Sequence, residues 1–347
     1  MTRGPARVAW VLSILAACTG VTDPPASPLS PLPLDPGSVT VSGVSSGGAM
    51  AVQFHASHSR LVQGAGILAA PPYFCAENEV GLALGRCMKG DGIPVERLLQ
   101  HADERARQGV IDPVEGMADD RVWLYRGAAD PHVAAAVADA LERYYRSRTR
   151  EASAVQRVEH PGAGHNFPVA HDRAAPCAAS EPPYLGSCGY AAARALLEHV
   201  YGPLAPPVDT TRLAALVPFD QRPYAEAARS AGLAEQGWLY VPTACRADGA
   251  PCRLHVVFHG CKQGVADVGD AFARGAGYLE VAEANRIVVL FPQVKPTLQP
   301  LNPLGCWDWW GYEGSDYATR DGRQIAAVRA MIDALIAEPG AASARSR

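Results

Sequence analysis

Apolar positions along the chain follow two patterns, short runs typical of strands and longer amphipathic stretches typical of helices. Several of the short runs are continuously apolar, as expected for strands buried on both faces of a parallel sheet. We predict strands at 39–42, 65–69, 122–126, 155–159, 237–241, 254–258 and 287–291. We predict helices near 48–57, 94–108, 132–148, 189–200, 265–284 and 322–337. This alternation predicts an α/β fold with a mostly parallel, doubly wound sheet flanked by helices.

A glycine- and serine-rich turn, Gly43-Val44-Ser45-Ser46-Gly47, joins the first predicted strand to the first predicted helix. A G-x-S-x-G motif in this position is the nucleophile elbow of serine hydrolases, in which the serine occupies a strained turn. Its small neighbours, Gly48 included, let the strand and the helix approach each other. We therefore predict Ser45 as the nucleophile and the backbone N–H of Ser46 as an oxyanion donor. The alternative is a plain glycine-rich turn.

A serine nucleophile needs a general base, and the base needs an orienting carboxylate. Asp130 follows the strand at 122–126, and His165 lies in a glycine-rich loop after the strand at 155–159. Because both follow strands, we predict Asp130 as the acid and His165 as the base. Asp130 could instead be only the cap of the helix that follows it. Weaker candidates for the two positions are His160, His171, Asp172 and Asp120.

The second oxyanion donor is expected in a His-Gly loop that follows another strand of the sheet. The strand at 254–258 leads into His259-Gly260-Cys261, so we predict the backbone N–H of Cys261 as that donor. We expect the sulfur of Cys261 in a disulfide and His259 as a structural residue of the loop.

The order of these segments along the chain is unusual. The His-Gly strand, the strand at 287–291 and the last helix normally precede the serine strand in hydrolases of this type, but here they follow the histidine loop. Joining residue 337 to residue 39 restores the usual order. We therefore predict a circularly permuted α/β-hydrolase, a rearrangement that proteins tolerate because chain ends can lie close together at the surface.

Four motifs together resemble the extracellular poly(3-hydroxybutyrate) depolymerases whose lipase box lies near the N-terminus. They are GVSSGGAM at 43–50, HGCKQ at 259–263, FPQ at 291–293 and GCWDWW at 305–310. The resemblance covers about residues 39–337 and implies a polyester or small ester as substrate. It also implies that Ser45, Asp130 and His165 are the triad and that Trp307 belongs to the substrate-binding cleft.

The tryptophan cluster agrees with this resemblance in part. Trp307, Trp309 and Trp310 cannot all face one way on a strand, because alternation separates the first two from the third. An aromatic wall suits a polyester with methyl branches, although all three side chains could instead be buried. Two other functions stay open, a carbohydrate or phenolic-acid esterase of the feruloyl or acetylxylan type and a lipid-anchored binding protein on an inactivated hydrolase scaffold.

The N-terminus has the pattern of an export signal. Two arginines precede an apolar stretch at 8–17, and Leu15-Ala16-Ala17-Cys18 resembles the lipobox of bacterial lipoproteins. By that resemblance Cys18 is acylated, and Thr19 after it favours the outer membrane. The alternative is an ordinary signal peptide with a chance cysteine. We expect an exported protein, extracellular or periplasmic if not an outer-membrane lipoprotein, with the lipid as its sole contact with a membrane.

The chain divides into four predicted parts. Residues 1–18 are the signal peptide, and the proline-rich residues 19–38 are an extended tether. Residues 39–340 form one catalytic domain, and residues 341–347 form a disordered tail. Many secreted members of the family carry a C-terminal polymer-binding domain, and this chain stops shortly after its last predicted helix. We therefore expect it to act on amorphous polymer or soluble oligomers rather than on crystalline granules.

The cysteine content and the net charge of the chain bear on disulfides, on metal binding and on a nucleic-acid partner. Apart from Cys18 the chain has eight cysteines, and an even number in an exported chain predicts disulfides. Neighbour pairing is the simplest of the 105 arrangements that eight cysteines permit. It gives Cys75–Cys87, Cys177–Cys188, Cys245–Cys252 and Cys261–Cys306. Because no C-x2-C pair has companion ligands, we expect no metal, and we expect no cofactor. A net charge of −4 gives no reason to expect a nucleic-acid partner.

Overall fold

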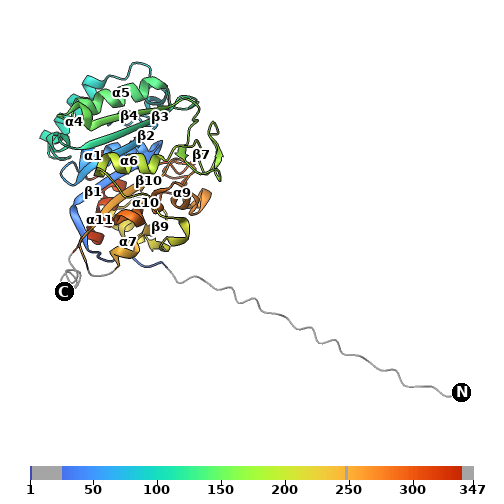
Figure 1. The fold of residues 1–347 in the computed structure, drawn as a ribbon. Coiled ribbons are helices and arrows are strands. Elements are labelled where there is room, and N and C mark those ends of the chain that lie inside the picture. The colour runs from blue at the N-terminus through green and yellow to red at the C-terminus, as the bar shows by residue number, and fades with distance from the viewer. Residues whose placement is uncertain (2–25, 247–248, 338–347) are drawn as a thin grey trace.

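The computed structural model describes Met1, residues 26–246 and residues 249–337 (Figure 1). One eight-stranded sheet crosses the domain in the order β4-β3-β2-β1-β10-β11-β9-β8. Its strands are β1 (Leu34–Val44), β2 (Val62–Leu68), β3 (Arg121–Gly127), β4 (Val155–His160), β8 (Leu216–Asp220), β9 (Gln236–Tyr240), β10 (Cys252–Phe258) and β11 (Ile287–Phe291). The strands from β4 to β11 in this order are parallel, whereas β9 runs antiparallel to both of its neighbours.

Helices cover both faces of this sheet (Figure 1). One buried apolar cluster contains side chains of α1 (Ser46–Ser57), α4 (Val95–Arg107), α5 (Ala135–Arg146) and α11 (Arg323–Ile336). A second contains side chains of α6 (Ala192–Tyr201), α9 (Ala271–Gly275) and α10 (Tyr278–Asn285). Strand side chains alternate between them, as in β10, where Leu254 and Val256 join the first cluster and Val257 the second. The predicted doubly wound α/β architecture is therefore confirmed.

Shorter elements complete the described chain. The helices are α2 (Val80–Leu84), α3 (Arg86–Lys89), α7 (Arg222–Ala228) and α8 (Val265–Val268), with 3-10 turns at Val114–Met117, Ala152–Ala154, Thr210–Arg212 and Thr243–Cys245. A small separate sheet pairs β5 (Phe167–Val169) and β6 (Ala175–Pro176) with β7 (Leu185–Ser187). None of the helices in the described residues combines the length and apolar character that a membrane crossing requires.

All seven predicted strands are present, but other parts of the structure differ from the prediction. The stretch at 265–284 is three short helices rather than one, because Gly269 and Gly277 adopt left-handed backbone conformations, with φ of 60° and 84°. The edge strand β8 was not predicted, since its sequence, Leu-Val-Pro-Phe-Asp, contains a proline that argues against a strand.

The two ends of the described domain meet beside the serine strand. Helix α11 packs against β1, and the backbone N–H of Leu32 donates to the carbonyl oxygen of Leu335 at 2.8 Å. Chain ends this close are what a circular permutation requires.

The predicted tether at 19–38 is too long. Residues 34–38 belong to β1, and Leu29 and Leu32 pack against the core. Leucines between the prolines bury apolar surface on the domain, an effect that the proline content alone does not reveal. The predicted acylation site Cys18 and the predicted tail at 341–347 lie outside the described residues.

Four disulfides join Cys75 to Cys87, Cys177 to Cys188, Cys245 to Cys252 and Cys261 to Cys306. These are the neighbour pairs that the sequence predicts. The first three close short loops, and the fourth joins positions 45 residues apart. Disulfides of this kind constrain the unfolded chain and are characteristic of exported proteins.

Three buried histidines are kept neutral by the core. His255 in β10 has its Nδ1 2.7 Å from the hydroxyl of Thr40 and its Nε2 2.8 Å from the hydroxyl of Ser42. Burial lowers the pKa of His255 to about 3 and, as the main cause, the pKa values of His58 and His259 to about 4.

We expect the folded protein to lose stability as the pH falls from about 6.5 to about 4. In this window the histidines of the unfolded chain bind protons, whereas the buried ones do not until about pH 4 or below, so acid favours unfolding. Urea unfolding at a series of pH values measures the effect. The variant His58→Gln, whose side chain does not titrate, should depend less on pH than the wild type. An identical pH dependence of the two proteins would contradict the explanation.

Candidate active site

Ser45 occupies a strained turn between β1 and α1. Its backbone has φ 58° and ψ −123°, a conformation rare for residues with a Cβ, and its N–H donates to the carbonyl oxygen of Leu68 at 2.9 Å. A Cβ on Gly43 would lie 2.2 Å from the carbonyl oxygen of Gly47, and one on Gly47 would lie 2.2 Å from that of Phe258. Glycine is therefore required on both sides of the turn. The geometry is that of the predicted nucleophile elbow.

The three residues predicted as a triad meet at this edge of the sheet. Nε2 of His165 lies 2.9 Å from Oγ of Ser45, and Nδ1 of the same ring lies 2.7 Å from Oδ2 of Asp130. Asp130 follows β3 and His165 follows β4, so the neighbouring strands present them together. With the proton on Nδ1 directed to the carboxylate, Nε2 is free to accept the serine proton.

Asp130 is held as a carboxylate by its surroundings. Its other oxygen accepts hydrogen bonds from the backbone N–H groups of His132 at 2.8 Å and Val133 at 2.9 Å. Burial opposes the negative charge, but the hydrogen bond and charge of His165, with the two amides, outweigh burial and hold the pKa of Asp130 below its usual value. Asp130 does not cap helix α5, which begins at Ala135.

The weaker candidates for base and acid have other surroundings. His171 approaches the carbonyl oxygen of Gly275 at 3.0 Å, and Asp120 pairs with the buried His55 at 2.8 Å. Asp172 is exposed at the surface.

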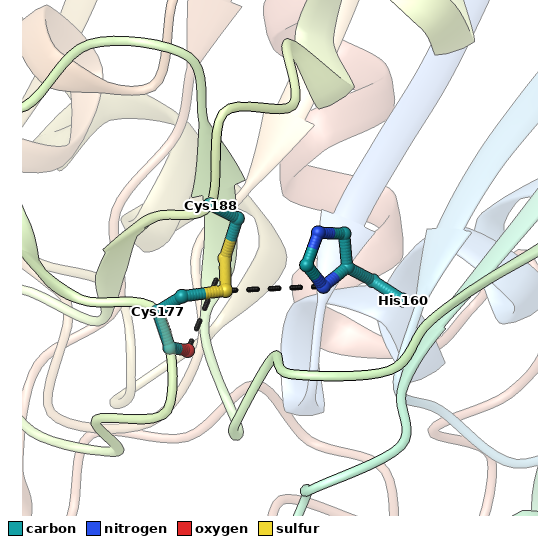
Figure 2. A group of neighbouring side chains, drawn as sticks. All are labelled: His160, Cys177 and Cys188. Atoms are coloured by element: carbon teal, nitrogen blue, oxygen red, sulfur yellow. Dashed lines mark hydrogen bonds between the residues drawn. A yellow bond between two sulfur atoms is a disulfide. The ribbon is translucent and has the colours of Figure 1, made fainter.

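His160 lies beside the disulfide between Cys177 and Cys188 (Figure 2). Its Nδ1 is 3.9 Å from the sulfur of Cys177. These three residues are near enough to one another to suggest a metal site. Their two sulfurs are bonded to each other, however, and a disulfide offers no thiolate ligand. We therefore assign no metal to this group.

The His-Gly loop lies directly against the nucleophile. A Cβ on Gly260 would lie 3.4 Å from Cβ of Ser45. Nε2 of His259 accepts from the N–H of Val294 at 3.2 Å, so its Nδ1 donates to the carbonyl oxygen of Gly260 at 2.7 Å. His259 is therefore a neutral residue that fixes the loop.

The backbone N–H groups of Ser46 and Cys261 are both available to a ligand. Among residues 26–246 and 249–337, neither amide has a protein acceptor. Two such amides beside a nucleophile can stabilise the negative oxygen of a tetrahedral intermediate.

A cleft of about 880 Å³ opens at the nucleophile and includes Ser45 and His165 in its lining. The lining is mostly apolar, and it contains four of the large apolar side chains that the protein exposes to solvent. These are Val80, Leu84, Leu301 and Leu304. Such a cleft suits an apolar ligand whose few polar groups are bound close to the nucleophile.

The tryptophan cluster differs from its prediction. Trp307 is fully buried beneath the cleft, packed edge to face against Phe258 with ring centroids 5.0 Å apart, and it is absent from the cleft lining. Trp309 and Trp310 line the cleft instead. The strand alternation that we assumed does not apply, because residues 307–313 form a turn rather than a strand. The prediction that Trp307 contacts substrate is therefore wrong for its side chain in this structure.

Asp308 organises this turn, a role that the sequence analysis missed. Its buried carboxylate accepts hydrogen bonds from four successive backbone N–H groups, with distances between 2.7 and 3.3 Å. They belong to Trp310, Gly311, Tyr312 and Glu313. Burial raises the pKa of Asp308 to about 7, against the effect of these amides. The only signal in the sequence was an aspartate among tryptophans.

We expect Asp308→Asn to loosen the aromatic wall of the cleft. The amide group of asparagine would face the N–H of Glu313 donor to donor, and such a loss costs about 1–3 kcal/mol of folding free energy. The KM for substrates that fill the cleft should rise, whereas the KM for a short p-nitrophenyl ester should change much less. Asp316→Asn, an exposed neighbour, is the control. Equal KM values for Asp308→Asn and the wild type would contradict this role.

Two curated proteins resemble this chain along most of its length. The poly(3-hydroxybutyrate) depolymerase of Delftia acidovorans is 40% identical over 309 residues, which are 88% of this chain and 61% of that protein. The chain therefore spans about three fifths of the length of this relative. The polyhydroxybutyrate depolymerase of Talaromyces funiculosus is 31% identical over 343 residues, which are 95% of this chain and 97% of that protein. A scan against family models found no match.

Two solved structures share the fold. One is a PHB depolymerase from Penicillium funiculosum, 29% identical with a TM-score of 0.83. The other is a serine-to-alanine variant of a PHB depolymerase complexed with an R3HB trimer, 28% identical with the same TM-score. Each alignment covers 89% of this chain and 99% of the other. With the identity to the Talaromyces protein, which is matched over nearly its whole length, this likeness shows that the chain belongs to the polyhydroxybutyrate depolymerase family.

Proposed function

We propose that this protein is a serine esterase that hydrolyses poly(3-hydroxybutyrate) or its oligomers to 3-hydroxybutyrate units through an acyl-enzyme. The observation that carries the proposal is the hydrogen-bonded chain from Asp130 through His165 to Ser45, which opens into an apolar cleft. Membership of the depolymerase family supports the choice of substrate.

The first half-reaction forms the acyl-enzyme. Ser45 Oγ attacks the ester carbonyl carbon while Nε2 of His165 takes its proton, and Asp130 holds the other nitrogen and stabilises the imidazolium. The negative oxygen that results is bound by the N–H groups of Ser46 and Cys261. When the intermediate collapses, His165 gives its proton to the leaving 3-hydroxyl group.

The second half-reaction returns the enzyme to its starting state. A water molecule donates a proton to His165 and attacks the acyl carbon, and the same two amides bind the oxygen. Ser45 leaves with the proton from His165, and the acyl half of the substrate departs as a carboxylic acid. Each turnover therefore consumes one ester bond and one water molecule.

The cleft favours this substrate over the alternatives that the sequence left open. Poly(3-hydroxybutyrate) presents methyl branches and ester groups but no hydroxyls within the chain, and it suits walls of Leu301, Leu304 and Trp310. A carbohydrate ester would leave hydrated hydroxyls against that apolar lining. An inactivated scaffold is disfavoured because Ser45, His165 and Asp130 keep the hydrogen bonds that catalysis needs.

We also propose that the protein is exported and anchored by a lipid on Cys18. Four disulfides support export, because such bonds form in oxidising compartments. The anchor rests on the sequence Leu15-Ala16-Ala17-Cys18 after an apolar stretch. Thr19 favours the outer membrane if the host has one.

If Cys18 is acylated, the wild type expressed in a Gram-negative host should incorporate labelled palmitate and remain with the membrane fraction. Cys18→Ser should incorporate none and appear in the soluble exported fraction, because two or more acyl chains are needed for stable anchoring. Cys245→Ser is the control for loss of a cysteine that is bonded elsewhere. Palmitate incorporation by Cys18→Ser would show that the cysteine is not the acylation site.

The wild type should release 3-hydroxybutyrate monomer or dimer from amorphous poly(3-hydroxybutyrate), and Ser45→Ala should not. Loss of a serine nucleophile lowers kcat by about a million-fold in the best-studied serine hydrolase. A fluorophosphonate probe should label the wild type and Ser147→Ala, an exposed serine, but not Ser45→Ala. Unchanged turnover by Ser45→Ala would refute the assignment. Cleavage of p-nitrophenyl esters without release of 3-hydroxybutyrate would show a serine esterase whose substrate is another small ester.

A further inference from the structure

Among the residues that the structure describes, the cleft lining has one basic side chain besides histidine. That side chain is Lys262, and the histidines in the lining are His132 and His165. Within the part of the chain that the structure describes, no aspartate or glutamate belongs to that lining. A lone cation in an apolar cleft is a feature that a wholly neutral ligand would not require.

The backbone holds Lys262 in place beside the oxyanion loop. It follows Cys261, whose sulfur is bonded to Cys306, and its own N–H donates to the carbonyl oxygen of Leu304 at 2.8 Å. Its φ of 55° lies in the left-handed region, and its side chain is exposed. The lysine side chain thus starts from a backbone position that follows Cys261 and is hydrogen-bonded to Leu304 of the cleft lining.

Asp267 is an acidic neighbour of Lys262. Burial raises the pKa of Asp267 above its usual value, and the nearby charge of Lys262, which lowers that pKa, is the smaller effect. None of the ion pairs found among residues 26–246 and 249–337 includes Lys262. The ammonium group is therefore available to a ligand anion.

The proposed substrate carries one such anion per chain. Every repeat of poly(3-hydroxybutyrate) is neutral, and the free carboxylate lies at one end only. For any ester bond that is cleaved, that carboxylate stays on the half that leaves with the new 3-hydroxyl group. A short oligomer brings its carboxylate close to the cleaved bond, whereas most bonds of a long polymer lie far from it.

We propose that Lys262 binds the terminal carboxylate of short 3-hydroxybutyrate oligomers and directs cleavage to the bonds near that end, a role that rests on the proposed function. Lysine suits it because its compact charge on a four-carbon stem can follow a flexible ligand. The residue would then select soluble oligomers over long polymer and release small acids from the carboxyl end.

The test compares the 3-hydroxybutyrate trimer as the free acid with its methyl ester, which keeps the shape but removes the charge. For the wild type at low salt, kcat/KM should be about two to five times higher for the acid, the range that exposed ion pairs provide. In Lys262→Gln this ratio should fall to about one, and Lys262→Arg should restore most of it. High salt should lower the wild-type ratio by screening.

Arg60→Gln is the matched control. Arg60 is exposed just beyond the end of α1 that is opposite Ser45, so this variant loses one positive charge far from the cleft and should keep the wild-type ratio. Equal ratios in the wild type and Lys262→Gln would overturn the inference, as would an equal fall in Arg60→Gln, which would point to overall charge. Failure of the wild type to cleave either trimer, with p-nitrophenyl esters still cleaved, would instead overturn the polyester function and this inference with it.

Discussion

The candidate active site depends on how closely the backbone of the serine turn approaches its neighbours. Gly43 and Gly47 allow contacts that a single extra carbon would prevent, and these contacts hold Ser45 in a strained conformation. The strain is sustained because parallel strands lie on both sides of β1. In β2, the carbonyl oxygen of Leu68 accepts a hydrogen bond from the N–H of Ser45, and the end of β10 at Phe258 lies against Gly47. His165 and the free amides of Ser46 and Cys261 can act together only because Ser45 is held at this fixed position.

The two sides of the cleft are held by different means. Near Ser45, backbone geometry and the sheet fix the candidate triad and the free amides of Ser46 and Cys261. The wall formed by residues 301–312 has little regular secondary structure. It is held by the Cys261–Cys306 disulfide and by the carboxylate of Asp308. Covalent and buried polar contacts replace sheet packing there, so this wall of the cleft can be irregular and still keep one shape.

The sequence predicted those parts of the molecule that local signals determine. The strands, the elbow and the histidine loop were found because apolar runs, glycines and the order of Ser45, Asp130 and His165 are visible within short windows. Trp307 was misplaced because its position depends on a turn built around Asp308, which no local pattern shows. The chain at 26–38 was predicted as tether because its contacts with the domain, such as that of Leu32 with Leu335, come from the other end of the sequence.

The permuted order of the chain has a consequence for synthesis. The strand that leads into Ser45 is made first, but its neighbour β10 and the amide of Cys261 are made more than two hundred residues later, since Thr40 and His255 are 215 positions apart. Pairing over such a distance slows folding because a long loop must close before the contacts form. During translation the emerging protein therefore carries Ser45 without the His259-Gly260-Cys261 loop beside it, and the candidate site is complete only after nearly the whole domain has left the ribosome.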